Sequence, residues 1–194
     1  SELTNISWLN YGKIRGGWAQ AGNAAATYAQ ANYAVVGTSF QNDPRYSQPG
    51  TAGNPDLKPE LKTTSEVGLE LSLFDRRLGI DFTYYDVTTT DLITPIELDA
   101  STGFPGKTFN AGKLQNKGIE ATVTINPVRT QDFRWDITWN FAKNDNKLLE
   151  LVDGTNELTL ANAPFQASLL AIVGQPYGQI YGTDFTYDNN GNKV

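Results

Sequence analysis

The sequence predicts an all-β protein built from antiparallel hairpins, and two observations support that fold class. Apolar and polar residues alternate with period two in several segments of the 194-residue chain, as they do in a strand with two unlike faces. The links between these segments are alternately short and long. Short links suit hairpins, whereas long structureless links are uncommon inside a compact soluble domain. The alternation of link lengths is therefore the strongest organisational signal in the sequence.

In chain order, a weak strand at residues 11–21 comes first. Residues 67–73 then place four aliphatic side chains on odd positions, and residues 78–84 repeat that alternation on even positions. The four residues between them, 74–77, are few enough for a tight turn. These two segments form the first clear hairpin.

A second hairpin follows at residues 119–125 and 133–141, and we expect Pro127 to end its first strand because proline cannot donate to the ladder. A tentative sixth strand covers residues 179–187. The three long links are residues 22–62, 91–112 and 144–176. The last of them contains an Ala- and Leu-rich stretch at residues 163–173 that could form a short helix.

Two architectures fit this alternation. Period two by itself favours a soluble β-sandwich, a reading that would suit a glycan-binding module. Two features favour the wall of a large transmembrane β-barrel. Residues 133–141 carry Trp and Phe on one face, with Trp135 near the short turn, as in an interfacial aromatic girdle. The opposite faces carry charged residues that suit an aqueous lumen: Glu66, Glu70, Asp81, Glu120, Arg134 and Asp136.

Composition excludes several function classes. The chain has no Cys and no His, which removes thiolate chemistry, Ser-His-Asp triads and the usual zinc ligands. Lys and Arg are scattered and the net charge is −6, which argues against a nucleic-acid partner. The longest nearly apolar stretch, residues 161–174, is too short for a transmembrane helix. We expect no enzyme activity, no catalytic residue and no cofactor, and we interpret Asp81 and Glu120 as part of a solvated face.

The acidic tail, Asp188 to Asn192, is similar in composition to a calcium loop. It lacks glycine at the sixth position and a later glutamate, so an Asn-Gly turn is the better interpretation and no metal site is expected. The chain contains no Met, and its first 22 residues show no signal peptide. We therefore expect a processed chain or a piece of a larger one.

Six blocks of sequence, taken in order, resemble the outer-membrane barrel of TonB-dependent transporters, and more narrowly the SusC/RagA-like nutrient importers. Each block alone is a weak signal, but their order and spacing are specific, and they span almost the whole chain. The blocks are the strand ending in Gly22-Asn23, the Asn54-Pro55-Asp56-Leu57-Lys58-Pro59-Glu60 segment, residues 74–85, residues 110–120, residues 133–144, and Val173-Gly174-Gln175-Pro176-Tyr177-Gly178.

This resemblance implies that residues 1–194 are part of a barrel domain in the outer membrane of a Gram-negative bacterium, with about six wall strands and three extracellular loops. Nothing in the chain resembles the family's N-terminal plug or TonB box, and 194 residues cannot close a barrel of about 22 strands. As the resemblance implies, the whole protein imports an oligosaccharide or a peptide. Its implied partners are TonB, acting through the plug, a SusD-like surface lipoprotein and the lipid bilayer.

Two sets of candidate site residues follow. Family-motif residues with an expected structural role are Asn54, Pro55, Leu57, Lys58, Pro59, Glu60, Asn116, Lys117, Gly118 and Glu120. Candidate substrate contacts are aromatic residues in the long links, where rings can stack on sugars and nearby amides can bind hydroxyls, although loop packing would explain each residue as well; they are Tyr28, Tyr33, Tyr46, Phe104, Phe109, Phe165 and Tyr177. Gly68 and Gly118 are expected on the polar face, where they permit a close approach of a plug or neighbouring backbone or relieve crowding.

Overall fold

The computed structural model describes residues 7–41, 43–152, 154–164, 166–188 and 190–193. The chain divides into two compact units. The first, called the sheet unit, comprises Lys62–Thr88, Gln115–Asn146 and the described part of Ser1–Ala21. The second, called the hairpin unit, comprises Gly22–Leu61, Thr89–Leu114 and Lys147–Val194, without its undescribed residues.

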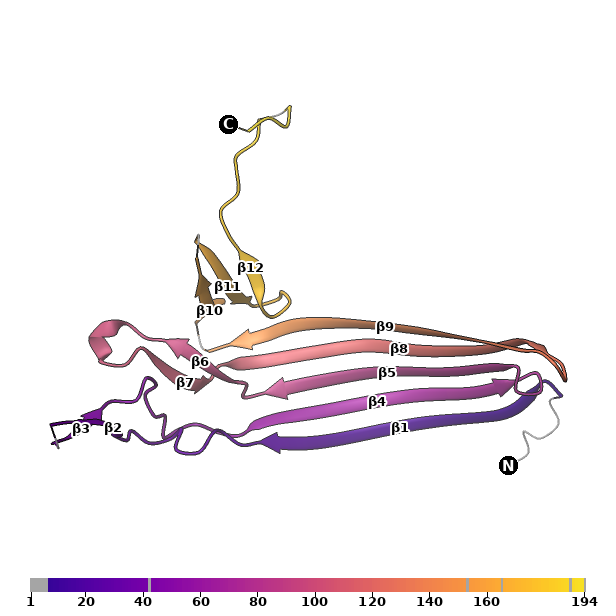
Figure 1. The fold of residues 1–194 in the computed structure, drawn as a ribbon, viewed down its shortest axis with the longest axis horizontal. Helices are drawn as coiled ribbons and strands as arrows, with labels where there is room; N and C mark the ends of the chain where they lie inside the picture. The colour runs from indigo at the N-terminus through magenta and orange to yellow at the C-terminus, as the bar shows by residue number, and fades with distance from the viewer. Residues whose placement is uncertain (1–6, 42, 153, 165, 189, 194) are drawn as a thin grey trace. The chain divides into compact units, whose positions relative to one another are not determined.

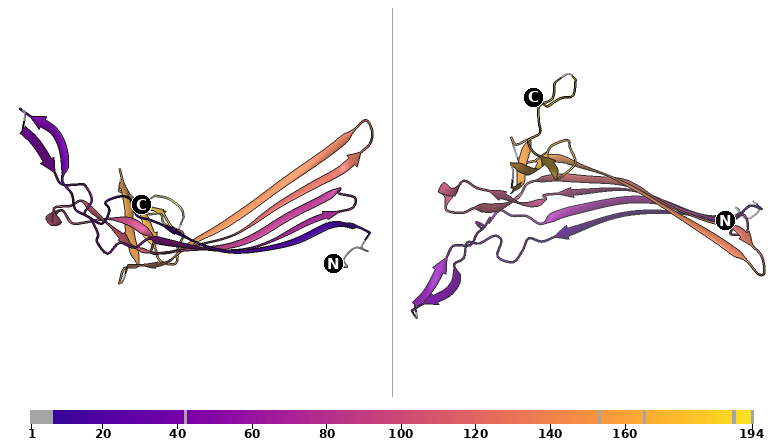
Figure 2. Two further views of the ribbon diagram at one scale, coloured as in Figure 1. Left: turned by 90° about the horizontal axis from the view of Figure 1, so that it is seen from below. Right: turned by 45° about the horizontal axis from the view of Figure 1, so that its top comes forward.

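Five long strands form one sheet in the order β1-β4-β5-β8-β9, so neighbours in the sheet follow one another along the chain. Their arrowheads alternate in direction, which makes the sheet an antiparallel meander (Figure 1). The sheet is a single layer within the sheet unit (Figure 2). The strands are β1 (Leu9–Asn23), β4 (Glu60–Leu73), β5 (Leu78–Thr90), β8 (Gly112–Arg129) and β9 (Arg134–Leu151).

The hairpin unit contains the shorter elements, which lie in the three long links except for β12, which follows the third link. β2 pairs with β3, β6 pairs with β7, and β11 lies between β10 and β12 in a three-stranded antiparallel sheet. The long links are thus mostly hairpins rather than structureless loops. Their elements are β2 (Val35–Phe40), β3 (Asp43–Ser47), β6 (Ile93–Glu97), the 3₁₀ turn η1 (Ala100–Thr102), β7 (Gly106–Asn110), β10 (Glu157–Ala163), β11 (Ala167–Ile172) and β12 (Gln179–Tyr181).

The turn between β4 and β5 confirms the predicted tight hairpin. Phe74, Asp75 and Arg76 all have positive φ, a conformation that costs about 1 kcal/mol or more for each residue with a side chain. Hydrogen bonds hold the turn: the Phe74 N–H donates to the Trp8 carbonyl at 2.8 Å, and the Arg76 N–H donates to the Asn10 side chain at 3.1 Å. The residues at the start of β1 therefore stabilise the turn between β4 and β5.

Strand lengths differ from the predicted ones. The five long strands have 13 to 18 residues, because their polar ends continue the ladder where the hydrophobic alternation has already faded. Pro127 does not end its strand: β8 runs on to Arg129. The fixed φ of proline suits extended backbone, and only one donor is lost near a strand end.

Two further predictions are wrong. The described part of residues 163–173 forms no helix, because β11 occupies Ala167–Ile172 and pairs with strands on both sides, which outweighs the helical preference of Ala and Leu. The tentative strand at residues 179–187 shortens to β12, Gln179–Tyr181, and β12 pairs with β11 rather than with the five-stranded sheet. Among the described residues, no helix is long and apolar enough to cross a membrane.

Candidate functional site

One face of the sheet unit is apolar and uncovered. Side chains alternate along each strand, so the large apolar residues of all five strands point to the same side, where neighbours such as Gly12 and Leu71 meet across β1 and β4. Trp139 and Phe141 stack on this face with ring centroids 5.8 Å apart. The exposed residues of this face are Ile14, Trp18, Val67, Phe82, Tyr84, Ile125, Trp135, Ile137, Trp139 and Phe141.

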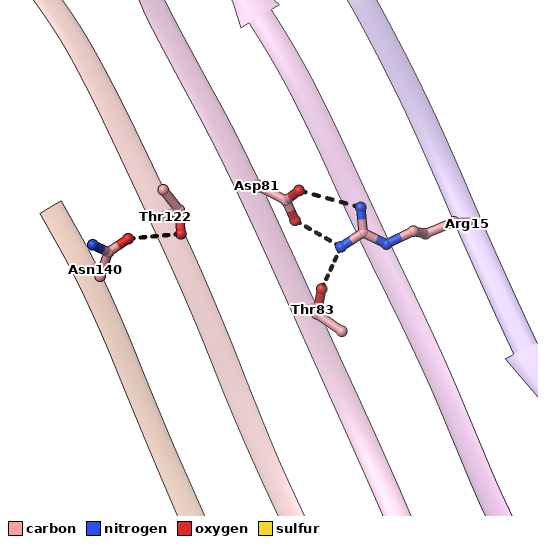
Figure 3. A network of polar contacts seen from close by, with 5 residues as sticks. All are labelled: Arg15, Asp81, Thr83, Thr122 and Asn140. Carbon is pink, nitrogen blue, oxygen red and sulfur yellow. Dashed lines mark hydrogen bonds and ion pairs between the residues drawn. The ribbon is translucent and has the colours of Figure 1, made fainter. Parts of the chain in front are cut away.

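The opposite face is polar and bound together by side chains. Arg15 of β1 reaches across β4 to β5, where its guanidinium donates to both Asp81 carboxylate oxygens at 2.7 and 3.2 Å and to the Thr83 hydroxyl at 2.6 Å (Figure 3). Gly68 of β4 lies beneath this bridge, because a Cβ there would come within 2.7 Å of the Arg15 Cγ. The ion pair therefore links three strands and depends on the missing side chain at Gly68.

Two further contacts on this face cross from strand to strand. Tyr85 lies over Gly118 and donates from its hydroxyl to the Asn144 side chain at 3.2 Å. The Thr122 hydroxyl donates to the Asn140 side chain at 2.9 Å (Figure 3). Gly68 thus accommodates a side chain of the wall itself, whereas Gly118 accommodates both the Tyr85 side chain and the neighbouring backbone, because a Cβ there would lie 2.6 Å from the Lys143 main-chain oxygen.

The motif at residues 116–120 joins this network. Asn116 accepts a hydrogen bond from the Asn146 side chain at 2.7 Å, and the Lys117 ammonium lies 3.3 Å from the Asp86 carboxylate. Glu120 is exposed on the polar face. Asp81, which the sequence analysis assigns with Glu120 to a solvated face, forms an ion pair with Arg15.

In the hairpin unit, the segment at residues 54–60 is held by hydrogen bonds of both its backbone and its side chains. Asn54 is buried: its side-chain amide donates to the Thr108 carbonyl at 2.9 Å, its N–H donates to the Ala29 carbonyl at 2.9 Å, and its side-chain oxygen accepts from the Asp56 N–H at 3.2 Å. Leu57 is also buried, whereas Pro55 and Pro59 are exposed. The prolines keep the residues before them extended, which suits a fixed lead-in to β4.

The same segment is fastened to β7 and β6 at its end. Asn110 forms a reciprocal pair with the Lys58 backbone, accepting from its N–H and donating to its carbonyl, both at 2.8 Å. Glu60 accepts from the Ile93 N–H at 2.7 Å and from the Asn23 side chain at 3.1 Å. The sequence analysis placed Asn110 in a family block but did not predict that it binds the Lys58 backbone.

Three of the predicted aromatic contacts meet in one place. Tyr33, Tyr46 and Phe104 line a shallow groove of about 430 Å³ together with five small or amide-bearing residues, namely Asn32, Ala34, Ser47, Gln48 and Pro49. Tyr28 joins this cluster from the side, because its ring centroid lies 6.0 Å from that of Tyr33. We call this set of residues the aromatic groove.

The loop that presents Phe104 is locally fixed. Asp99 caps η1 by accepting from the Ser101 N–H at 2.8 Å, and hydrogen bonds from the Ser101 hydroxyl and backbone lower the pKa of Asp99. The Thr102 hydroxyl donates to the Phe104 carbonyl at 3.0 Å. Asn32 and Gln48, which the sequence analysis did not single out, belong to the groove because the link at residues 22–62 folds back on itself, and Phe104 reaches the groove from the link at residues 91–112.

The remaining aromatic candidates lie elsewhere. Phe109 lines a different, apolar pocket with Ile96 and Leu158, and the Lys107 ammonium lies 4.8 Å from the centre of its ring. Tyr177 is partly buried in the turn before β12. Phe165 lies outside the described residues. The seven candidates therefore do not form a single site.

The acidic tail forms a turn. The Gly191 N–H donates to the Asp188 carbonyl at 3.0 Å, and Gly191 has a φ of +83°. The Asp188 carboxylate accepts from the Asn192 backbone and side chain and from the Asn190 N–H, and these hydrogen bonds lower its pKa. Across the part of the chain that is described, no group of three or more His, Cys, Asp or Glu residues could hold a metal ion.

A meander of long antiparallel strands, apolar and uncovered on one face and ion-paired on the other, is the pattern of a β-barrel wall. The family described as TonB dependent receptor-like, beta-barrel matches residues 4–194. The chain therefore belongs to this TonB-dependent receptor family.

Relatives and solved structures agree with the family. The chain is 29% identical over 192 residues to TonB-dependent receptor P39 of Formosa agariphila. The matched region covers 97% of the chain and 18% of that receptor. It is 27% identical to TonB-dependent receptor SusC of Bacteroides thetaiotaomicron, covering 99% of the chain and 21% of that receptor. These matches confirm the SusC/RagA-like resemblance.

The fold matches a solved structure titled as the RagAB peptide transporter with a TM-score of 0.80 at 22% identity, over 100% of the chain and 23% of that protein. The match confirms the all-β barrel fold. The chain spans about a fifth or less of the length of its curated relatives.

Proposed function

We propose that this chain supplies wall strands and extracellular loops to a TonB-dependent importer in the outer membrane of a Gram-negative bacterium. The observation that carries the proposal is the sheet unit itself, with its large aromatic and aliphatic side chains exposed on one face and the Arg15–Asp81 network on the other. In water that apolar face would promote aggregation, whereas lipid tails solvate it. A soluble β-sandwich is not favoured, because the described strands of the sheet unit form one sheet with exposed apolar side chains, and the chain belongs to a family of β-barrel receptors.

The importer acts with partners and a substrate. TonB supplies energy through the plug of the whole protein, and a SusD-like lipoprotein works at the cell surface. A SusC relative in Bacteroides thetaiotaomicron and a RagAB structure titled as a peptide transporter support this kind of assembly. An oligosaccharide or a peptide is the imported substrate, and the aromatic groove is the part of the loops that contacts it. Relatives named as receptors and transporters support transport rather than catalysis.

The motif residues have a structural role in this proposal. Asn54 and Glu60 fix the lead-in to β4 by binding the backbone of other links, and Asn116 and Lys117 bind side chains of neighbouring strands. The first motif thereby fixes the loops within the hairpin unit, and the second joins strands within the sheet unit. The substrate-contacting residues are instead the exposed aromatic ones.

The whole protein, produced in a Gram-negative host from its native gene, tests this function. We expect it to fractionate with the outer membrane and to migrate faster on a gel before boiling than after. We also expect it to support uptake of an oligosaccharide or a peptide, and this uptake should stop when TonB is deleted. Folded, monomeric protein in the soluble fraction would contradict the membrane assignment. Uptake that continues without TonB would contradict the energy source.

A further inference from the structure

Three arginines lie at the end of the five-stranded sheet where short turns join the strands. Arg76 and Arg77 belong to the turn between β4 and β5, and Arg129 is the last residue of β8, before the turn into β9. The two turns are at the same end of the sheet (Figure 1), where the Asn126 N–H of β8 donates to the Arg77 carbonyl at 2.7 Å. All three arginines are exposed. We call them the short-turn arginines.

Arg129 lies on the apolar face of the sheet unit. Ile125 is on this face, and successive side chains of a strand point to opposite sides, so Pro127 and Arg129 point the same way as Ile125. A partner of Arg129 therefore has to combine an anionic group with apolar chains that lie along the same face. A small anion in water lacks the second property.

Aromatic rings accompany the arginines at this end. Phe133 and Trp135 follow the β8–β9 turn and are 59% and 52% exposed. Beside the other turn, the rings of Trp8 and Phe74 lie with their centroids 6.4 Å apart. Amphipathic rings of this kind lie at the level of the lipid headgroups in membrane proteins. The rings thus mark the height at which the short-turn arginines meet a bilayer.

The short-turn arginines carry charge that their surroundings do not neutralise. Among the described residues, no ion pair includes any of the three guanidinium groups, or the carboxylates of Asp75 and Asp132 in the same two turns. Three cations against two anions leave one positive charge in excess. Arg134, just after the second turn, instead forms an ion pair with Asp136 at 2.7 Å.

The other end of the same apolar face is different. Lys117 and Lys143 each precede a residue that faces the polar side, so both lysines point to the apolar side. The Lys117 ammonium lies 3.3 Å from the Asp86 carboxylate, and the Lys143 ammonium lies 3.6 Å from the Asp145 carboxylate. These lysines have carboxylate partners, whereas the described residues provide none to the short-turn arginines. Only the short-turn end therefore offers unpaired cations to an external anion.

We propose that the short-turn arginines bind the phosphate groups of anionic glycerophospholipids in the periplasmic leaflet of the outer membrane. The inference rests on the proposed function, because short turns of an outer-membrane barrel face the periplasm and its apolar face contacts lipid tails. The planar guanidinium fork matches phosphate oxygens, and basic residues at a bilayer surface attract anionic lipids. A zwitterionic lipid is the weaker ligand, because its own ammonium group already neutralises its phosphate.

Photocrosslinking of the whole protein in lipid nanodiscs tests the proposal at defined positions. The discs contain equal amounts of phosphatidylglycerol and phosphatidylcholine with identical acyl chains. The photoreactive residue p-benzoylphenylalanine replaces either Phe133, at the short-turn end, or Phe141, two residues from Lys143. Mass spectrometry of the adducts gives the ratio of the two lipids at each position. We expect phosphatidylglycerol to exceed phosphatidylcholine about fivefold at position 133, the factor for one cation at an anionic surface. At position 141 the ratio should be close to that of the bilayer.

Substitutions assign the enrichment to the arginines. Arg129→Gln should remove most of the phosphatidylglycerol enrichment at position 133, whereas Arg129→Lys keeps the charge and should retain much of it. Lys143→Gln is the matched control, because it removes a cation from the same face that already has a carboxylate partner, and it should leave the ratio at position 141 nearly unchanged.

The outcomes separate this inference from the proposed function. Lipid adducts at position 133 without phosphatidylglycerol enrichment would overturn the inference. Enrichment of equal size at positions 133 and 141 would also overturn it, as would enrichment that persists when Arg76→Gln, Arg77→Gln and Arg129→Gln are combined. Absence of lipid adducts at both positions would instead refute the membrane assignment itself, because the apolar face would not contact lipid.

Discussion

The sheet unit and the hairpin unit are stabilised in different ways. Among the described residues, six of the seven buried apolar ones belong to the hairpin unit (Ala52, Leu57, Ala111, Leu148, Leu170 and Ala171), and Leu73 belongs to the sheet unit. The sheet unit instead relies on its ladder hydrogen bonds and on side chains such as Arg15 that join strands on the polar face. Many of its large apolar residues are exposed, including Trp18, Trp135 and Trp139.

In the proposed function, the two units are surrounded by different solvents. The hairpin unit buries apolar groups within the protein, as a water-soluble domain does. The sheet unit leaves its apolar groups for an environment outside the chain, and a lipid bilayer is the solvent that accepts them. Substitutions that are equivalent in chemistry and exposure should therefore have different effects in the two units.

The largest effect is expected from Leu148→Ala in the hairpin unit. Leu148 is 0% exposed, and its backbone pairs with the turn at Gly174 and Gln175. The substitution leaves a cavity and should lower the free energy of unfolding by about 3 kcal/mol. Ile137→Ala, on the apolar face of the same strand, should cost under about 1 kcal/mol, because lipid tails fill the space. Urea unfolding of the whole protein in lipid vesicles measures both, and equal losses would contradict the division into two units.

A matched pair of isoleucines tests the solvents directly. Ile14 in β1 is 81% exposed and Ile180 in β12 is 82% exposed. In vesicles, Ile14→Lys should destabilise the protein by about 2 kcal/mol, because the ammonium enters the hydrocarbon region. Ile180→Lys should change stability by less than about 0.5 kcal/mol, because its side chain faces water. If Ile14→Lys is as harmless as Ile180→Lys in the same unfolding assay, the apolar face does not contact lipid.

The smallest change in stability is expected on the polar face, where the effects of substitutions at Gly68 and Arg15 should not be additive. Gly68→Ala should lower the free energy of unfolding modestly, because the new methyl group displaces the Arg15 side chain from Asp81. In a protein that already carries Arg15→Ala, Gly68→Ala should have little effect on this free energy. Gly118→Ala is the control, since a Cβ there would also lie 2.6 Å from the Lys143 main-chain oxygen, which no side-chain substitution removes. Additive effects of Gly68→Ala and Arg15→Ala would show that the bridge is not formed.

Much of the sheet unit was predictable from the sequence. The alternation at residues 67–73 and 78–84 identified β4, β5 and their four-residue turn, because a strand with two different environments imposes period two on its residues. The strand at Ala167–Ile172 was not predictable, because its small and aliphatic residues suit a helix, and only pairing with β10 and β12 decided between the two.

The aromatic groove was predictable only in part. Tyr33, Tyr46 and Phe104 were identified as candidates from their residue type and their place in long links, but the same reasoning gave equal weight to Phe109 and Tyr177, which lie elsewhere. Asn32 and Gln48 were missed, because a single amide in a loop carries no signal until its neighbours are known.

The sequence by itself determined the class of protein, the strand faces and the family, because period-two patterning and ordered motifs are local properties of the chain. The tertiary structure alone decided which distant residues meet: Arg15 with Asp81 across β4, Asn110 with the Lys58 backbone, and Tyr33 with Phe104 in the groove. Such contacts depend on strand order, register and the folding of one link against another. Those are properties of the whole chain, in which residues more than 50 positions apart are brought within hydrogen-bonding distance.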